Sequence, residues 1–132
     1  MKVVIAGSRH FKGYDLLKEK CDSILKNTSD VEVVCGMCPN GADKLAVQYA
    51  KERGYPIKEF PAEWSKHGRA AGPIRNKQMA EYADALIAFN SGGGGTVNMI
   101  KEASRCNLKI REIPVTTVFQ HGKEEYIQRK GL

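Results

Sequence analysis

Short apolar runs alternate with amphipathic segments along most of this chain. Runs of about four to eight residues, rich in β-branched side chains and bounded by polar residues, are typical of strands buried on both faces of a sheet. Such runs occupy residues 2–6, 31–35, 56–60, 84–90 and 109–113, and a further run at 115–119 suits a sheet edge. The pattern therefore predicts a sheet of five or six strands.

The segments between these runs carry apolar residues at helical spacing. Leu17 and Cys21 lie one turn apart in the first such segment, with charged residues between them. Gly54 suits the end of the second helix, and Pro73 suits the first turn of the third. The polar stretch 61–72 before this proline is expected to be a loop. Helices are predicted over residues 14–27, over 43–53, from Pro73 onward and over 96–106.

Alternation of strands and helices within 132 residues predicts one α/β domain. Right-handed crossovers between parallel strands would make it a single Rossmann-like, doubly wound fold, with a mainly parallel β-sheet and helices on both faces. Hydrophobic residues make up 42% of the chain, which suffices for a packed core and excludes a wholly disordered protein. The domain is expected to span residues 1–119, followed by a polar C-terminal tail at 120–132.

No apolar run approaches the roughly 20 residues that a membrane helix needs. The apolar start of the chain is too short for a signal peptide, so we expect a cytoplasmic protein without membrane contact. Cys35 and Cys38 form a CxxC, but no second cysteine or histidine pair completes a zinc site. The four cysteines are interpreted as structural, with a redox or metal role as the alternative, and no metal site is expected.

The formal net charge of +6 comes from 21 basic and 15 acidic residues. Such a balance is compatible with a nucleic acid partner, with a phosphate-bearing small molecule or with solubility alone. Residues 64–77 hold Lys66, Arg69, Arg75 and Lys77 and no acid, so most of the excess charge lies in one segment. This concentration favours a local funnel for a small anion over a nucleic-acid surface, and no helix-turn-helix signature or aromatic-rich basic groove is recognisable.

The strongest chemical signal is the glycine run between a predicted buried strand and a predicted helix. In doubly wound sheets, ligands bind at the carboxyl ends of the strands. Glycines let backbone N–H groups approach an anion, and a helix N-terminus adds partial positive charge. A threonine at this point can cap the helix or bond a phosphate oxygen, whereas a plain turn is the alternative interpretation. The expected phosphate-binding residues are Gly92, Gly93, Gly94, Gly95 and Thr96.

The loops after the first two predicted strands supply further candidates. Gly7 and Ser8 can turn tightly beside a ligand, and Arg9 can pair with a phosphate or else lie in solvent. No GxGxxG motif is present there, which disfavours an ordinary dinucleotide-dependent dehydrogenase. Gly36 and Asp43 belong to the second loop, where Asp43 can cap a helix, bond a ribose hydroxyl or position an arginine.

The third loop carries aromatic, basic and amide side chains. Trp64 can stack on a base or fold back onto the core. Arg75 is expected to contact phosphate, and Asn76 is expected to orient a ribose together with Asp43. His67 is interpreted as a solvated histidine, with a catalytic role as the alternative.

These stretches together resemble the SLOG superfamily, and most closely its small YspA-like branch of bacteria and phages. The resemblance rests on Gly7-Ser-Arg-His-Phe11, on Gly36 to Asp43, and on Trp64 through Arg75-Asn76 to the glycine run, and it covers residues 2–113. The superfamily includes the DNA-processing Smf/DprA proteins and the LOG phosphoribohydrolases, which release a free base from a nucleoside monophosphate. The resemblance implies a Rossmann-like fold and a nucleotide-type ligand.

The LOG pattern is only partly present. Arg75, Met79 and Asp84 match it, as does the glycine run, but its catalytic glutamate falls on Met99. A thioether can neither stabilise positive charge on a ribose nor activate water. A catalytic carboxylate would therefore have to come from Asp43, or from Glu102, which lies three residues after Met99.

The sequence therefore favours a binding module for a nucleoside phosphate, an ADP-ribose-like molecule or a nucleotide sugar, acting as a sensor or as a sequestering protein. No cofactor is required. The alternative is a LOG-like hydrolase that cleaves the N-glycosidic bond of a nucleoside phosphate. DNA binding of the Smf/DprA kind ranks lowest, and a homo-oligomer is compatible with the resemblance.

Overall fold

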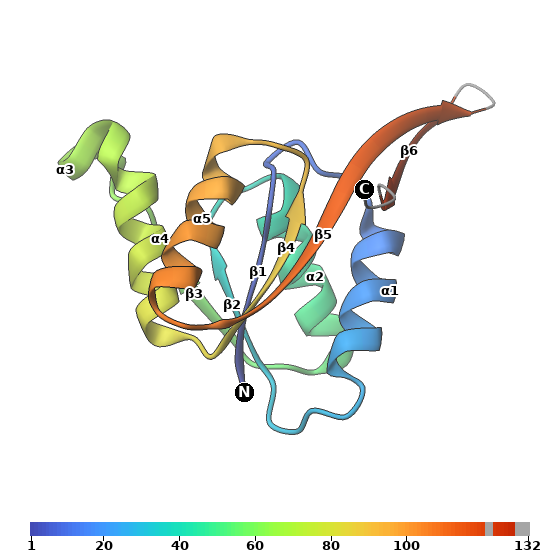
Figure 1. Ribbon diagram of the computed structural model, residues 1–132, viewed down its shortest axis with the longest axis horizontal. Coiled ribbons are helices and arrows are strands. Elements are labelled where there is room, and N and C mark those ends of the chain that lie inside the picture. Colours follow the sequence, from blue (N-terminus) through green and yellow to red (C-terminus); the bar gives the residue numbers. More distant parts are fainter. Residues whose placement is uncertain (121–122, 129–132) are drawn as a thin grey trace.

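A six-stranded sheet with the order β3-β2-β1-β4-β5-β6 forms the centre of the protein (Figure 1). The computed structural model describes residues 1–120 and 123–128. The strands are β1 (Lys2–Gly7), β2 (Glu32–Gly36), β3 (Ile57–Phe60), β4 (Ala85–Asn90), β5 (Lys109–Gln120) and β6 (Lys123–Gln128). Neighbouring strands are parallel, except that β5 and β6 are antiparallel. The predicted doubly wound, mainly parallel α/β fold is confirmed.

Helices cover both faces of this sheet (Figure 1). They are α1 (Tyr14–Leu25), α2 (Gly41–Arg53), α3 (Trp64–His67), α4 (Ala71–Tyr82) and α5 (Gly94–Arg105), with a 3-10 turn at Gly68–Ala70. In β1, Val3 and Ile5 pack with α1 and α2, whereas Val4 and Ala6 pack with α4 and α5. Because successive side chains of a strand point to opposite faces, burial on both faces requires the continuous apolar run seen in the sequence. None of the described helices combines the length and the apolar character that a bilayer span requires.

The segment 61–72, which the sequence analysis expected to be a loop, is largely helical. It contains α3, the 3-10 turn and the first two residues of α4. No side chain of α3 is buried, so this helix leaves no apolar periodicity in the sequence.

The end of the chain also differs from the expectation. β5 is one continuous strand, and Pro114 pairs with Asn90 at the last position of the β4–β5 register. Beyond this point β5 pairs with β6, so the missing N–H of the proline falls where β5 leaves β4. Within the expected polar tail at 120–132, Lys123–Gln128 forms β6, and residues 121–122 and 129–132 lie outside the described part of the chain.

One aromatic side chain anchors strand β6, in which Glu124, Glu125, Ile127 and Gln128 are exposed. The ring of Tyr126 packs edge-on against Phe11, with their centroids 5.4 Å apart, and Phe11 in turn stacks on Phe89 of β4. The Tyr126 hydroxyl lies 3.3 Å from the carbonyl oxygen of His10 and 3.0 Å from Glu124 Oε1, so its one proton is shared between these two acceptors. The terminal strand is therefore attached to the loop that follows β1.

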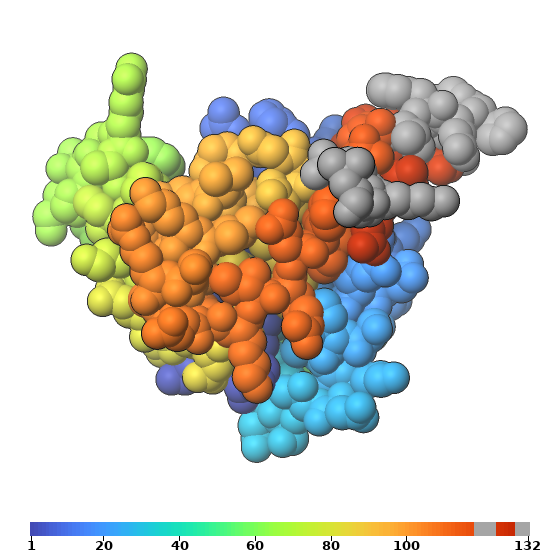
Figure 2. Space-filling model, in the orientation of Figure 1, coloured from blue at the N-terminus to red at the C-terminus, as the bar shows by residue number. Residues whose placement is uncertain are grey.

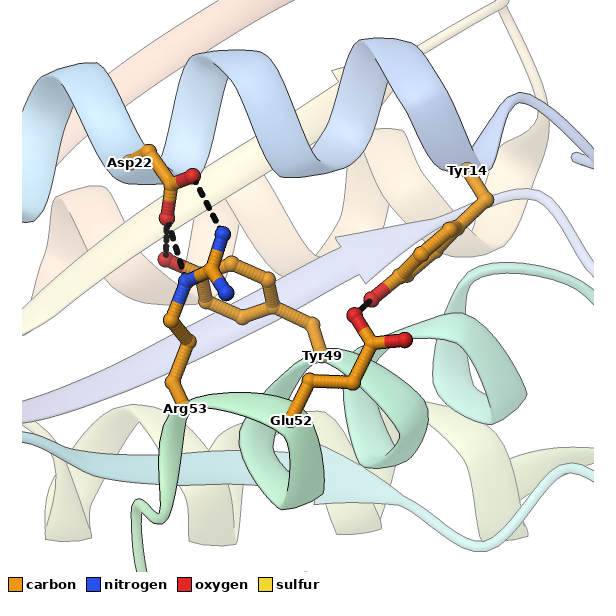
Figure 3. A network of polar contacts seen from close by, with 5 residues as sticks. All are labelled: Tyr14, Asp22, Tyr49, Glu52 and Arg53. Atoms are coloured by element: carbon orange, nitrogen blue, oxygen red, sulfur yellow. Dashed lines mark hydrogen bonds and ion pairs between the residues drawn. The ribbon is translucent and has the colours of Figure 1, made fainter.

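A polar network joins α1 to α2 (Figure 3). Asp22 of α1 accepts hydrogen bonds from the Tyr49 hydroxyl at 2.7 Å and from Arg53 Nε at 2.9 Å, and Arg53 Nη2 donates to its second oxygen at 2.6 Å. Nearby, the Tyr14 hydroxyl donates to the Glu52 carboxylate. Chiefly because Arg53 donates to it, the Asp22 carboxyl has its pKa lowered to about 2.

This network predicts a pH-dependent contribution of Asp22 to stability. A folded-state pKa of about 2 lies below the unfolded value of roughly 3.9, so the contribution is fully present above pH 4 and is lost as the pH falls through 2. Asp22→Asn is expected to lower the free energy of unfolding by about 1 kcal/mol at pH 6, a modest value because the Asp22 side chain is 42% exposed. Urea unfolding followed by circular dichroism should show the difference from the wild type shrinking between pH 6 and pH 2.

Glu19→Gln is the matched control, because it removes one negative charge from an exposed position of the same helix. Its effect at pH 6 is expected to be smaller. A loss of stability in Asp22→Asn that stays constant down to pH 2 would contradict the assignment.

Candidate functional site

The carboxyl ends of β1, β2 and β4 open onto a cavity of about 930 Å³. The strand order reverses at β1, and this switch point is where open α/β sheets bind their ligands. The volume lies within the range of roughly 300–1,000 Å³ that is usual for small-molecule sites. The sequence-predicted residues that line the cavity are Gly7, Ser8, Arg9, Asp43, Trp64, Arg75, Asn76, Gly93, Gly94, Gly95 and Thr96.

Helix α5 begins inside the glycine run, at Gly94, rather than at Thr96. Gly92 has a φ of 96°, and its N–H donates to Asn90 Oδ1 at 2.8 Å, which turns the chain from β4 into the helix. The N-cap residue is Gly93 and no side chain caps the helix, so of the two roles considered for Thr96, capping is not found. Thr96 is buried in the first turn. An uncapped helix start leaves backbone N–H groups at the wall of the cavity.

Packing does not explain why this run lacks side chains. A Cβ added at Gly92, Gly93, Gly94 or Gly95 would meet no heavy atom of the described residues within 4 Å. Of these four glycines, only Gly92 has a positive φ, which favours glycine. The start of α5 therefore presents bare backbone to an open space.

The loop after β1 crosses directly over the start of α2. Gly41 has a φ of 71°, and a Cβ at this position would lie 2.3 Å from Arg9 Cα and 2.4 Å from the carbonyl oxygen of Ser8. That Ser8 oxygen accepts a hydrogen bond from the Ala42 N–H at 3.1 Å. The start of α2 is thus covered by protein, whereas the start of α5 is open. Arg9 itself is exposed at the rim of the cavity.

Asp43 is the third residue of α2 and does not cap it, because the N-cap residue is Asn40. Its carboxylate accepts a hydrogen bond from the Cys38 N–H at 3.2 Å. Gly36 makes room for this group, since a Cβ there would lie 2.2 Å from Arg75 Nη1 and 2.8 Å from Asp43 Oδ2. Burial raises the pKa of the Asp43 carboxyl, and the Cys38 N–H and the Arg75 guanidinium offset only part of this effect.

A chain of hydrogen bonds connects Arg75 to the start of α5. Arg75 Nε donates to Asn76 Oδ1 at 3.1 Å, and Arg75 Nη1 donates to the Phe60 carbonyl oxygen at 3.5 Å. Asn76 Nδ2 donates to the Gly95 carbonyl oxygen at 3.3 Å and to Asn98 Oδ1 at 2.9 Å. These bonds tie α4 to the glycine run and hold the guanidinium in place.

Two exposed apolar side chains border the cavity. Trp64 is 59% exposed on α3, so it does not fold back onto the core, and Met37, which follows β2, is 54% exposed. Helix α3 stands out at the edge of the molecule (Figure 2). Lys66 and Arg69 are exposed but do not line the cavity, so the cationic groups at its wall are Arg9 and Arg75.

Glu102 does not reach the cavity. It lies about 12 Å further along α5 than Gly94, at roughly 1.5 Å per residue, and its carboxylate accepts a hydrogen bond from Arg105 at 3.1 Å. Met99, where the LOG pattern has its catalytic glutamate, does line the cavity and is 1% exposed. Of the two candidate carboxylates, only Asp43 is therefore at the cavity wall. Gly36 and Gly92 also lie outside the lining set.

The cysteines show no arrangement suited to metal binding. All four are free thiols, and no group of three or more His, Cys, Asp or Glu residues in the described part of the chain is placed to hold a metal ion. Burial raises the pKa of the Cys35 thiol to about 12, which leaves it protonated and unreactive at neutral pH. Cys38 contributes its backbone N–H to Asp43.

Sequence reasoning did not single out Met37 or Asn98. An apolar residue after a strand and an amide inside a helix are ordinary features, and only the folded chain brings both to the cavity. One signal was present for Asn98, which is a polar residue between Val97 and Met99 in an apolar part of α5.

Residues 1–67 match the family described as the YspA, cpYpsA-related SLOG family (YAcAr). The matched half of the chain includes β1, β2 and β3, the loop that carries Ser8 and Arg9, and the helices that carry Asp43 and Trp64. The chain is also similar to the Gene 61 protein of Mycobacterium phage D29, with 29% identity over 117 residues, which cover 83% of this chain and 93% of the phage protein. Because this family match covers half of the chain, the chain belongs to the YspA, cpYpsA-related SLOG family.

Proposed function

We propose that this protein binds a nucleotide or a nucleotide-derived molecule and holds its phosphate at the start of α5. Membership of the SLOG family indicates a nucleotide-related small molecule as the ligand. The observation that carries the proposal is the uncapped, side-chain-free helix start that forms one wall of the cavity. Backbone N–H groups and the helix dipole together make such a terminus attractive to an anion.

The two helix starts at the cavity differ in ways that favour α5 over α2 as the phosphate site. The first turn of α2 carries Asp43, and the Ser8 carbonyl oxygen occupies the Ala42 N–H. The first turn of α5 carries no acidic residue. A phosphate at α2 would meet a carboxylate and a carbonyl oxygen, whereas at α5 it would meet backbone N–H groups and no carboxylate.

The remaining wall residues suit the other parts of a nucleotide. Arg9 and Arg75 supply positive charge for phosphate oxygens, and the Asp43 carboxylate is a hydrogen-bond acceptor for ribose hydroxyls. Trp64 and Met37 offer apolar surface against which a base can stack. Because Met99 replaces a catalytic carboxylate at the wall, the ligand is expected to be retained intact, as a sensor or a sequestering protein requires.

Replacing Gly94 by aspartate tests the phosphate site. A carboxylate at this position would repel a bound phosphate, and we expect Gly94→Asp to weaken binding at least about 100-fold. The space around Gly94 is open, so the fold and the melting temperature should be preserved. Isothermal titration calorimetry with AMP, ADP-ribose and NAD measures the change, and circular dichroism checks the fold.

Gly94→Ala is the matched control, because it adds a Cβ without charge and is expected to lower the affinity much less. Equal affinity of Gly94→Asp and wild type for a ligand in this set would place the phosphate elsewhere in the cavity.

N-glycosidic hydrolysis is a second candidate function, favoured by one observation. Asp43 is a carboxyl group at the cavity wall whose pKa is raised by burial, as is common for groups that transfer protons in catalysis. In this reading Asp43 would activate water or stabilise positive charge on the ribose, and Glu102 would have no part.

Incubation with AMP and NAD, followed by chromatography, separates retention from hydrolysis. We expect no release of adenine or nicotinamide beyond the rate without protein. Release that Asp43→Asn abolishes and Glu102→Gln preserves would replace the binding-only function with a hydrolase.

Burial of Asp43 also predicts a cost in stability that depends on pH. Because the pKa in the folded protein lies above the unfolded value, ionisation favours the unfolded chain as the pH rises through the unfolded and then the folded pKa. Asp43→Asn should therefore match the wild type near pH 3.5 and unfold at a higher urea concentration at pH 7. A variant that is less stable than the wild type at pH 7 would show that Asp43 is held mainly by a favourable ion pair.

A further inference from the structure

Two side-chain amides lie beside the glycine run, one from α4 and one from α5. Asn76 of α4 is 6% exposed, and Asn98 of α5 is partly buried. Both line the cavity, and they are joined by the hydrogen bond from Asn76 Nδ2 to Asn98 Oδ1 at 2.9 Å. The direction of this bond determines which atom of Asn98 remains for a ligand.

Two neighbours of Asn76 that can each play only one hydrogen-bonding role determine the direction of the Asn76–Asn98 bond. Arg75 Nε can only donate, so the Asn76 atom 3.1 Å from it is the oxygen. The Gly95 carbonyl oxygen can only accept, so the Asn76 atom 3.3 Å from it is the nitrogen. That nitrogen also faces Asn98 and must donate to it, so Asn98 presents Oδ1 to Asn76.

The hydrogen bonds of Asn76 leave it no N–H group to donate to a ligand. Its two N–H groups go to Gly95 and Asn98, and its oxygen receives the Arg75 N–H. Asn76 therefore positions Asn98 and has no N–H for a ligand, whereas its oxygen accepts, within the described part of the chain, only the Arg75 bond and keeps a lone pair for a ribose hydroxyl. Asn98, in contrast, uses its oxygen within the protein, and among the described residues no acceptor receives a hydrogen bond from its Nδ2.

We propose that Asn98 Nδ2 is a fixed hydrogen-bond donor that binds an oxygen atom of the ligand. The proposal rests on the proposed nucleotide-binding function and adds a contact to it. Side chains of a helix lean toward its N-terminus, so the Asn98 amide lies over the turn that contains Gly94 and Gly95. There it adds a directed donor to the backbone N–H groups at the start of α5. An amide in this orientation selects an acceptor, such as a phosphate or sugar oxygen, and rejects a donor.

Hydrogen exchange of the side-chain amides tests the orientation without any ligand. In ¹⁵N NMR spectra of the free protein, the Asn76 NH₂ protons should exchange slowly because both are donated to protein oxygens. The Asn98 NH₂ protons should exchange at least about tenfold faster because they face the open cavity. Spectra of Asn98→Asp and Asn76→Asp assign the two signals. Equally slow exchange at Asn98 would show that its donor is used within the protein and would overturn the proposal.

Two substitutions of Asn98 test the contact itself. Asn98→Asp keeps an oxygen for Asn76 and converts the outward donor into a charged acceptor, whereas Asn98→Ala removes the donor alone. Calorimetric titration with AMP, ADP-ribose and inorganic phosphate should show about a tenfold loss of affinity for Asn98→Ala and a larger loss for Asn98→Asp. Gln78→Glu, at an exposed position of α4 outside the cavity, makes the same amide-to-acid change and should bind as the wild type does.

The outcomes separate this inference from the function on which it rests. If the wild type binds a probe and both Asn98 variants bind it equally well, the contact is wrong and the binding function stands. If the wild type binds none of the probes, the proposed function is wrong, and the proposed contact between Asn98 and the ligand is wrong as well. The exchange measurement still decides the orientation of the Asn98 amide in that case.

Discussion

The parallel pairing of β1 with β4 is the constraint on which the site depends. Their register sets Gly7 opposite Phe89, and a Cβ at Gly7 would lie 2.9 Å from Ala42 Cβ and 3.0 Å from the Phe89 carbonyl oxygen. The end of β1 is therefore pressed between the start of α2 and the end of β4. Because the strand order reverses here, the starts of α2 and α5 reach one cavity from opposite faces of the sheet.

The glycines around the cavity serve two different purposes. Gly36 and Gly41 lack a side chain because other parts of the protein occupy the space, namely the Arg75 guanidinium and the loop after β1. The run from Gly92 to Gly95 lacks side chains although the space is empty. The first kind of glycine shapes the cavity, and the second kind leaves backbone exposed inside it, where an anion can approach.

A continuous polar layer links the two ends of the cavity. Arg75 lies beside Asp43 over the end of β2 and is bonded to Asn76, which in turn holds Asn98 at the glycine run. Burial makes ionised Asp43 unfavourable for stability, and such a cost is typical of groups kept for binding or catalysis. Because the members of the layer share hydrogen bonds, substitutions within it are expected to be non-additive.

The amino-acid sequence alone determined most of the fold and the position of the glycine run at the cavity. Apolar runs and helical spacing are local patterns, and they placed β1 to β4, the longer helices and the glycine run between β4 and α5. They did not reveal α3, which buries no side chain, or β6, whose attachment depends on Tyr126 packing against the distant Phe11. The continuity of β5 through Pro114 depends on a change of partner strand, which no local pattern records.

Only the tertiary structure decided which candidate residues lie together at the cavity. Asp43 and Glu102 are both carboxylates on predicted helices, but one lies at the start of α2 beside the cavity and the other beyond the first turns of α5. The direction of the Asn76–Asn98 bond likewise depends on Arg75 and Gly95, which reach it from two different helices. Sequence patterns report the periodicity of burial along one element, whereas a binding site depends on distances between elements, and those distances exist only once the sheet has assembled.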